Sequence, residues 1–355
     1  MTKRRDDLRE LSGYHSPQVE AKVRLNTNES AFVASDALVA EAMESLPGIL
    51  ANLNRYPDRE ALALRAAIAK MHGLGSERIF CANGSNEILQ LILLAYGGPG
   101  RKALVFEPTY ALHSQIARIT GTQVVFAARN EDFGIDRDVA LAAIKDEQPE
   151  VIFLCSPNNP TGNVDSRELL REILGASDAL VVLDEAYVQF ADEAISDVLG
   201  GASERLLVVR TFSKTWALAG LRLGYVLAAP QVVDDLQIVA LPYHLSAITQ
   251  ALGMIAVGHL EDMEASIALI RSERERVSTA LIALGAQLWP SQANFILFRP
   301  RMRPARALWK ALVDSSVLIR DFSQRDDLED CLRVTIGTAA ENSAFLAAYE
   351  EADHD

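Results

Sequence analysis

Between about residues 79 and 227, the chain alternates short, solid apolar runs with segments whose apolar residues repeat at helical spacing. The apolar runs lack period-two alternation, which is typical of parallel strands that helices cover on both faces. The pattern therefore predicts an α/β domain built on a mostly parallel sheet. The predicted strands are 79–81, 103–107, 122–128, 151–156, 179–183 and 206–211, and the predicted helices begin at 87 and span 112–119, 136–146 and 166–174.

The two ends of the chain have a different pattern of apolar and polar residues. The opening segment is polar and irregular to about residue 34, and helical spacing follows at 36–46 and 59–72, with Tyr56 on the loop between them. Beyond about residue 230, a long charged helix at 261–284 precedes short alternating strands, an α+β pattern. These changes predict an N-terminal arm that contributes to a small domain (1–40), a large domain (41–235) and a small C-terminal domain (236–355).

The most informative polar stretch follows the 206–211 strand, where Thr211, Ser213, Lys214 and Arg222 gather. A lysine at the mouth of a buried strand is poorly hydrated, which lowers the pKa of its ammonium and frees the amine as a nucleophile. The hydroxyls and the guanidinium suit a phosphate. An amine beside a phosphate seat is what a Schiff base with pyridoxal phosphate requires. A solvated lysine at a strand end is the alternative.

A second phosphate contact is predicted where the turn from Asn83 through Gly84 and Ser85 to Asn86 opens into an apolar helix. Free backbone N–H groups and the positive end of the helix dipole point out of the fold at such a place. The alternative is that Ser85 only caps the helix.

Other polar residues also follow predicted strands, where the ligands of open α/β sheets bind. Asp184 ends a buried strand, where an unpaired carboxylate is costly, so a cationic partner such as a protonated pyridine nitrogen is expected. A structural salt bridge is the alternative. Asn159 and Tyr187 can donate to a ring hydroxyl, and Tyr110 can stack on a ring face.

Two arginines of the C-terminal strands are candidates for binding anionic substrate groups. Arg333 lies on the polar face of the strand CLRVTIGT and can present a planar fork to a carboxylate. Arg320, in VLIRD, can hold a second anionic group. Solvated strand arginines are the alternative for both.

Composition narrows the class of protein further. The chain has 355 residues and a formal net charge of -14, which disfavours nucleic acid or anionic membrane as a main partner. Cys81, Cys155 and Cys331 are far apart in the sequence, so buried thiols are expected rather than disulfides or a zinc site. No histidine pairing indicates a metal site, and the N-terminus has no apolar signal core. A cytoplasmic enzyme without a metal is expected.

Several motifs together resemble the fold-type I aminotransferases of class I and II, most closely the histidinol-phosphate aminotransferases. The resemblance covers nearly the whole chain, from LNTNES to CLRVTIGT, and rests on NRYPD, NGSNE, EPTY, SPNNPTG, VVLDEAY and TFSKTWALAGLRLGY. It implies a large domain that binds pyridoxal 5'-phosphate and a smaller α+β domain.

The resemblance also implies roles for individual residues. Lys214, Asp184 and Tyr187 are implied to be catalytic, with Lys214 as the Schiff-base lysine and proton carrier. Asp184 is placed at the pyridine nitrogen, Asn159 and Tyr187 at the ring hydroxyl, and Tyr110 against the ring. The phosphate contacts come from Ser85, Asn86, Thr211, Ser213 and Arg222, with Gly84 in the same turn.

Members of this family are homodimers in which a tyrosine matching Tyr56 reaches the neighbouring subunit's cofactor phosphate. Arg333 matches the arginine for the α-carboxylate, and Tyr14, Asn28 and Arg320 fall near the substrate. The implied reaction moves an amino group between histidinol phosphate and 2-oxoglutarate or glutamate, in histidine biosynthesis. An aromatic amino-acid aminotransferase, a threonine-phosphate decarboxylase and a non-catalytic protein that binds pyridoxal phosphate are the alternatives.

Overall fold

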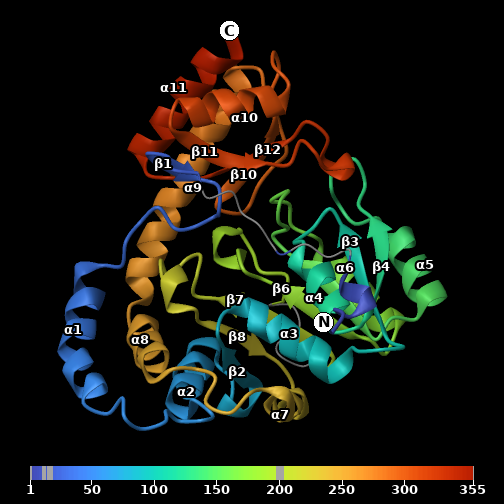
Figure 1. The fold of residues 1–355 in the computed structure, drawn as a ribbon, viewed down its shortest axis with the longest axis vertical. Coiled ribbons are helices and arrows are strands. Elements are labelled where there is room, and N and C mark those ends of the chain that lie inside the picture. Colours follow the sequence, from blue (N-terminus) through green and yellow to red (C-terminus); the bar gives the residue numbers. More distant parts are fainter. Residues whose placement is uncertain (1, 10–12, 14–18, 197–203, 355) are drawn as a thin grey trace.

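A seven-stranded, mostly parallel sheet forms the larger part of the fold (Figure 1). The computed structural model describes residues 2–9, 13, 19–196 and 204–354. Within them the strand order is β2-β8-β7-β6-β5-β3-β4, and only β8 runs antiparallel to its neighbours. The predicted α/β class is therefore confirmed. The strands are β2 (Ile79–Ala82), β3 (Lys102–Glu107), β4 (Gln123–Ala128), β5 (Val151–Cys155), β6 (Leu180–Asp184), β7 (Leu206–Thr211) and β8 (Gly224–Leu227).

Both faces of this sheet are covered by helices. Successive side chains of a strand point to opposite faces, so Val105 and Val209 belong to the core under α3, α4 and α7, while Leu104 and Val208 face α5 and α6. Burial on both sides explains why these strands are solid apolar runs in the sequence. The covering helices are α3 (Ser85–Tyr96), α4 (Leu112–Ile119), α5 (Arg137–Glu147), α6 (Arg167–Ala176) and α7 (Pro230–Val239).

A second sheet, of order β1-β11-β12-β10-β9, carries the C-terminal strands and one strand from the N-terminal arm. In Figure 1 the blue β1 lies beside β11 at the edge of this sheet. β1 pairs in parallel with β11, and the other pairs are antiparallel. Ile270, Leu308 and Phe345 share its core. Its elements are β1 (Val23–Leu25), β9 (Gln287–Leu288), β10 (Phe295–Arg299), β11 (Val317–Asp321) and β12 (Leu332–Thr335), with α9 (Leu260–Ala283), α10 (Ala305–Asp314) and α11 (Ala339–His354).

The predicted domain boundary at 235/236 stays a prediction, and the packing of the helices around it favours a later position. The predicted boundary falls inside α7, where Leu236 is fully buried in the core of the first sheet. The next helix, α8 (Ala247–Val257), packs on α1 (Asp36–Leu50) and α2 (Leu62–His72). Along α9, Leu260 and Met263 contact the core around α2 and α8, whereas Ile270 belongs to the core of the second sheet. We therefore place the boundary within α9 and keep the division into two domains as a proposal.

The strand register brings the ends of the parallel strands together at one edge. Cys155 at the end of β5 lies opposite Asp184 at the end of β6, and Asp184 lies opposite Val209 of β7. The segments that leave these strands therefore start side by side, as the location of ligands in such sheets requires. Short 3₁₀ helices in the connections span Asp6–Leu8, Ser76–Arg78, Val188–Phe190, Ala219–Leu221 and Asp326–Leu328.

Candidate active site

A cavity of about 370 Å³ opens at this strand edge, between the parallel strand ends, the N-terminal arm and β12. It brings together most of the side chains that the sequence singles out. Gly84 of the same set precedes α3 at the cavity's edge, where it caps the helix. The predicted residues that line the cavity are Asn28, Ser85, Asn86, Tyr110, Asn159, Asp184, Tyr187, Thr211, Ser213, Lys214, Arg222 and Arg333.

Lys214 reaches the cavity from the turn after β7, and its Nζ donates a hydrogen bond of 3.1 Å to the carbonyl oxygen of Thr27. Burial lowers the pKa of its ammonium to about 8, and the nearby positive charge of Arg333 lowers it as well, against a smaller opposing effect of Glu29. The expected lowered pKa is therefore present in the fold. The amine is a nucleophile at a pH where exposed lysines are protonated.

This lowered pKa predicts that the protein without cofactor gains stability at alkaline pH. Because the folded state binds the Lys214 proton less tightly than the unfolded state does, its free energy of unfolding rises as pH goes from about 8 toward the unfolded pKa. Relative to Lys214→Met, the gain is about 2 kcal/mol between about pH 7.5 and 9.5. Urea unfolding of both proteins at each pH measures it, and parallel pH profiles for the two would contradict it.

Asp184 has a partner that the sequence analysis missed. Its carboxylate is 2% exposed; Oδ2 lies 3.0 Å from His113 Nε2, and Oδ1 accepts a 3.1 Å hydrogen bond from the amide of Ala186. The His113 ring stacks on Phe153 at 4.9 Å between centroids. His113 follows Tyr110 by three residues, a spacing that puts two side chains on the same side of a helical turn. This spacing was the only sequence signal that His113 lies near the site. His113 and the amide of Ala186 therefore fix the position of the Asp184 carboxylate, which also lines the cavity.

The predicted phosphate seat lies at the N-terminus of α3. Ser85 is the first helical residue, two residues before the expected start, and the capping position belongs to Gly84, which makes no side-chain cap. Glycine is required here because φ is +82° and a Cβ would lie 2.6 Å from an Arg222 nitrogen. Arg222 Nη1 donates to Ser213 Oγ at 3.4 Å, and Thr211 Oγ1 donates to the same oxygen at 3.0 Å. A guanidinium, hydroxyls and helix N–H groups therefore converge.

A chain of hydrogen bonds joins the arm to the opposite wall of the cavity. The Tyr187 hydroxyl oxygen accepts from Asn28 Nδ2 at 3.0 Å and from Asn159 Nδ2 at 3.4 Å. Burial raises the pKa of the Tyr187 phenol, so it stays protonated and can donate into the cavity. Arg333 donates to the Asn159 side-chain oxygen and, at 3.0 Å, to the carbonyl of Asn26. Tyr110 donates to Asn86 Oδ1 at 3.2 Å.

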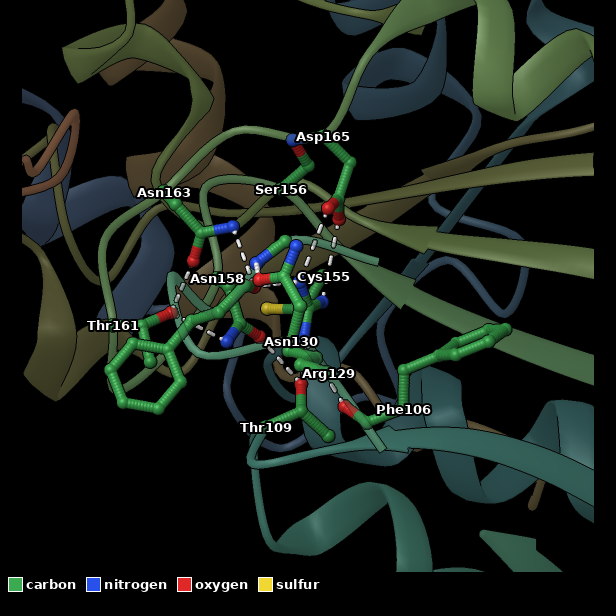
Figure 2. A network of polar contacts seen from close by, with 12 residues as sticks. Phe106, Thr109, Arg129, Asn130, Cys155, Ser156, Asn158, Thr161, Asn163 and Asp165 are labelled. Carbon is green, nitrogen blue, oxygen red and sulfur yellow. Dashed lines mark hydrogen bonds and ion pairs between the residues drawn. The ribbon is translucent and has the colours of Figure 1, made fainter. Parts of the chain in front are cut away.

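The loop that carries Asn159 rests on a buried polar network (Figure 2). Asn158 donates to the Pro108 carbonyl at 2.9 Å and accepts from the Thr109 hydroxyl at 2.7 Å, which ties this loop to the segment before Tyr110. Below it, Arg129 forms a two-pronged ion pair with Asp165, at 3.1 and 3.3 Å, and both side chains are almost fully buried.

Breaking this buried pair is expected to destabilise the fold. Asp165→Asn leaves a buried guanidinium without its carboxylate and should lower the free energy of unfolding by about 3 kcal/mol. Asp138→Asn is the control, because Asp138 pairs with Arg137 at the exposed surface, where solvent screening leaves an ion pair little effect on stability. Urea unfolding measures both, and equal, small losses would contradict the role of the network.

A second cavity of about 330 Å³ adjoins the first and shares Tyr110, Asn159 and Arg333 with it. Arg320 lines it, as expected for a residue that binds an anionic substrate group. Arg325, which the sequence analysis missed, lies here too and forms an ion pair of 3.0 Å with Glu107. The ion pair links the end of β3 to the loop after β11, two segments whose proximity no local pattern reveals.

Two predicted residues are not placed in these cavities. Tyr56 is 80% exposed and stacks on Tyr243 at 4.4 Å, outside both cavities of its own chain. Tyr14 lies outside the described residues. The three cysteines are free and buried, as expected. In the part of the chain that the structure describes, no cluster of ligating side chains suits a metal ion, and no helix is long and apolar enough to cross a membrane.

Residues 20–348 match the family of class I and II aminotransferases. The chain belongs to this family, and the expected enzyme class, a pyridoxal phosphate-dependent aminotransferase, is confirmed. The similar curated relatives include the histidinol-phosphate aminotransferase of Mycolicibacterium smegmatis, 46% identical over 355 residues that cover 98% of this chain and 92% of that protein. The histidinol-phosphate aminotransferase of Mycobacterium avium is 45% identical, covering 97% of this chain and 87% of that protein.

Solved structures share the fold. Histidinol-phosphate aminotransferase from Sinorhizobium meliloti, in complex with pyridoxal-5'-phosphate, has a TM-score of 0.90 at 23% identity and covers 100% of this chain and 98% of its own. L-threonine-O-3-phosphate decarboxylase from Porphyromonas gingivalis has a TM-score of 0.77 at 25% identity, with 93% of this chain and 98% of its own covered. Both likenesses support the fold-type I architecture.

Proposed function

We propose that this aminotransferase moves an amino group between histidinol phosphate and 2-oxoglutarate, a reaction of histidine biosynthesis. Relatives that carry the name histidinol-phosphate aminotransferase are 42–46% identical over nearly the whole chain. The observation that carries the substrate choice is a pair of guanidinium groups. Arg320 and Arg333 are directly opposite each other on β11 and β12. Both line the second cavity, which adjoins the cavity that Lys214 lines. Two arginines at one site suit a phosphate ester.

The residues of the first cavity fit pyridoxal phosphate. Different sides of the cavity carry the amine of Lys214, whose pKa is lowered, the buried carboxylate of Asp184, and the N-terminus of α3 with its partial positive charge. Lys214 would bond to the aldehyde and Asp184 would accept from the pyridine N–H. Asn159 and Tyr187 would donate to the ring hydroxyl, and Tyr110 would lie against the ring. The phosphate would be held by Ser85, Asn86, Thr211, Ser213 and Arg222.

In the proposed reaction, different residues of the chain have different roles. Bound in the cavity, pyridoxal phosphate supplies an electron-withdrawing ring that makes the substrate's α-hydrogen acidic. Asp184, which His113 contacts at 3.0 Å, would accept from the N–H of the ring nitrogen. Lys214, whose pKa burial lowers to about 8, would in its neutral form take the proton from the reacting carbon of the substrate and later return it. Arg333 and Arg320 orient the substrate through its anionic group.

We further propose that the enzyme acts as a homodimer in which Tyr56 contacts the cofactor phosphate of the second copy. Tyr56 and its stacking partner Tyr243 are both exposed, and Ile238 and Leu241, which shortly precede Tyr243 in the chain, are 80% and 75% exposed. Apolar surface of this kind typically marks an interface. The position of Tyr14 near the substrate phosphate remains a prediction. The cytoplasmic location of the protein also remains a prediction.

Single-turnover reactions of the holoenzyme test the substrate. Histidinol phosphate, phenylalanine and O-phosphothreonine are each mixed with the enzyme, and the change in cofactor absorbance gives the rate and the apparent affinity. Histidinol phosphate should react fastest. Preferential turnover of phenylalanine would instead support an aromatic aminotransferase, and release of CO₂ from O-phosphothreonine would support a decarboxylase.

Arg320→Ala should weaken phosphorylated donors selectively. Loss of a charge-assisted contact to phosphate is expected to raise the KM for histidinol phosphate by roughly tenfold to a hundredfold, with a change below about threefold for phenylalanine. Arg299→Ala is the control, because Arg299 lies over Trp289 and lines neither cavity. Equal loss for both donors would refute the assignment of Arg320 to phosphate.

A further inference from the structure

The two substrate-facing arginines form an unusual pair. Arg320 of β11 and Arg333 of β12 are cross-strand partners, so their side chains leave the same face of the sheet. Like charges directly opposite each other in an antiparallel pair destabilise the sheet. A neighbouring group that offsets part of the two positive charges therefore lowers the cost of this arrangement.

The aromatic ring of Phe322 contacts both of them. The Arg320 guanidinium carbon lies 5.6 Å from the ring centroid, and that of Arg333 lies 5.4 Å from the same centroid. These separations are within the range of cation–π attraction, in which the negative ring face offsets part of the positive charge. Arg333 also lies 5.0 Å from the centroid of Phe295, so aromatic rings flank its guanidinium.

Phe322 is itself anchored. It extends β11 by one residue, since its amide donates to the carbonyl of Cys331 at 3.1 Å. Its side chain is partly buried and packs on the apolar cluster formed by Phe133, Trp289, Leu297, Leu328 and Cys331. Two residues beyond Arg320, it lies on that residue's face of the strand, while β12 brings Arg333 alongside. The backbone therefore fixes the ring between the core and the two cations.

We propose that Phe322 is a positioning residue that holds Arg320 and Arg333 as a preformed clamp for one dianionic group. The ring lowers the cost of bringing the two cations together and restricts their rotamers, so less order is lost when the anion binds. The clamp favours a phosphate ester over a single carboxylate, which needs one guanidinium only. The inference deepens the proposed function and rests on it for the identity of the phosphate ester.

Binding of inorganic phosphate to the holoenzyme tests this clamp without relying on turnover. The dissociation constant of inorganic phosphate is measured by titration calorimetry of the holoenzyme, for the wild type, Phe322→Leu and Phe322→Tyr. Leu keeps the apolar contact and removes the ring, so phosphate should bind roughly fivefold more weakly. Tyr keeps the ring and should bind within about twofold of the wild type.

Phe133→Leu is the matched control, because Phe133 packs in the same apolar cluster and its ring contacts the tilted ring of Trp289 rather than an arginine. It should leave phosphate binding unchanged. The proposal is overturned if Phe322→Leu binds phosphate as tightly as the wild type, or if both leucine variants weaken binding equally. Rejection of histidinol phosphate by the wild type, with the phosphate effect of Phe322→Leu intact, would refute the proposed substrate and leave the clamp standing.

Discussion

Lys214→Ala should lose the visible absorbance of covalently bound cofactor and at least about a thousandfold in turnover. Lys214 lines the cavity, and the proposed function gives its Nζ two roles: the bond to the cofactor aldehyde and the movement of the substrate proton. Alanine removes both roles. It also removes a buried ammonium, which is costly to the fold, so the variant should remain folded. Absorbance spectra of the reconstituted protein and steady-state turnover with histidinol phosphate measure the two losses separately.

Lys102→Ala is the control for this prediction. Lys102 pairs with Glu147 at 2.9 Å on β3, lines neither cavity, and should leave spectrum and turnover unchanged. Added methylamine can replace the missing amine as a base, so partial recovery of the Lys214→Ala rate is expected. An unchanged spectrum in Lys214→Ala would mean that another amine carries the cofactor.

Asp184→Asn should lower kcat by about a hundredfold or more while the protein remains folded. The amide has the shape of the carboxylate but lacks its charge, so the proton of a ring nitrogen is no longer held by a buried anion. The interaction acts on the chemical step, so kcat should fall more than the affinity for donor. His113 also loses the charge that it faces at 3.0 Å.

Asp165→Asn is the matched control for Asp184→Asn. Both carboxylates are buried, but Asp165 faces Arg129 rather than the cavity. The Asp165 variant should therefore lose stability and keep its kcat, whereas the Asp184 variant should keep more stability and lose its kcat. Equal kcat losses in the two variants would show that the effect comes from the fold and not from the reaction.

The larger sheet and most of the first cavity could be predicted from the sequence for a simple physical reason. Strands buried on both faces are continuous apolar runs, and a polar residue directly after such a run must lie at the strand end. Asp184, Asn159 and Lys214 all follow strands whose ends the register aligns. The motifs around them then identified a family whose chemistry needs those residue types.

What the sequence did not reveal depends on contacts between distant segments. β1 is three residues long and pairs with β11 nearly three hundred residues later, so no local period marks it. His113 meets Asp184 only because α4 packs beside the end of β6, and Phe322 meets Arg333 only through the pairing of β11 with β12. The later domain boundary that we propose follows from α7 and α8, which pack on the first sheet and its neighbouring helices after the composition changes.

The central claim is that Lys214 Nζ is the atom to which the cofactor aldehyde bonds. The direct measurement is to treat the wild-type holoenzyme with borohydride, digest it, and determine by mass spectrometry which lysine carries a reduced pyridoxyl phosphate group. The peptide that contains Lys214 should carry it at close to one group per chain. Labelling of any other lysine, with the Lys214 peptide unmodified, would contradict the account.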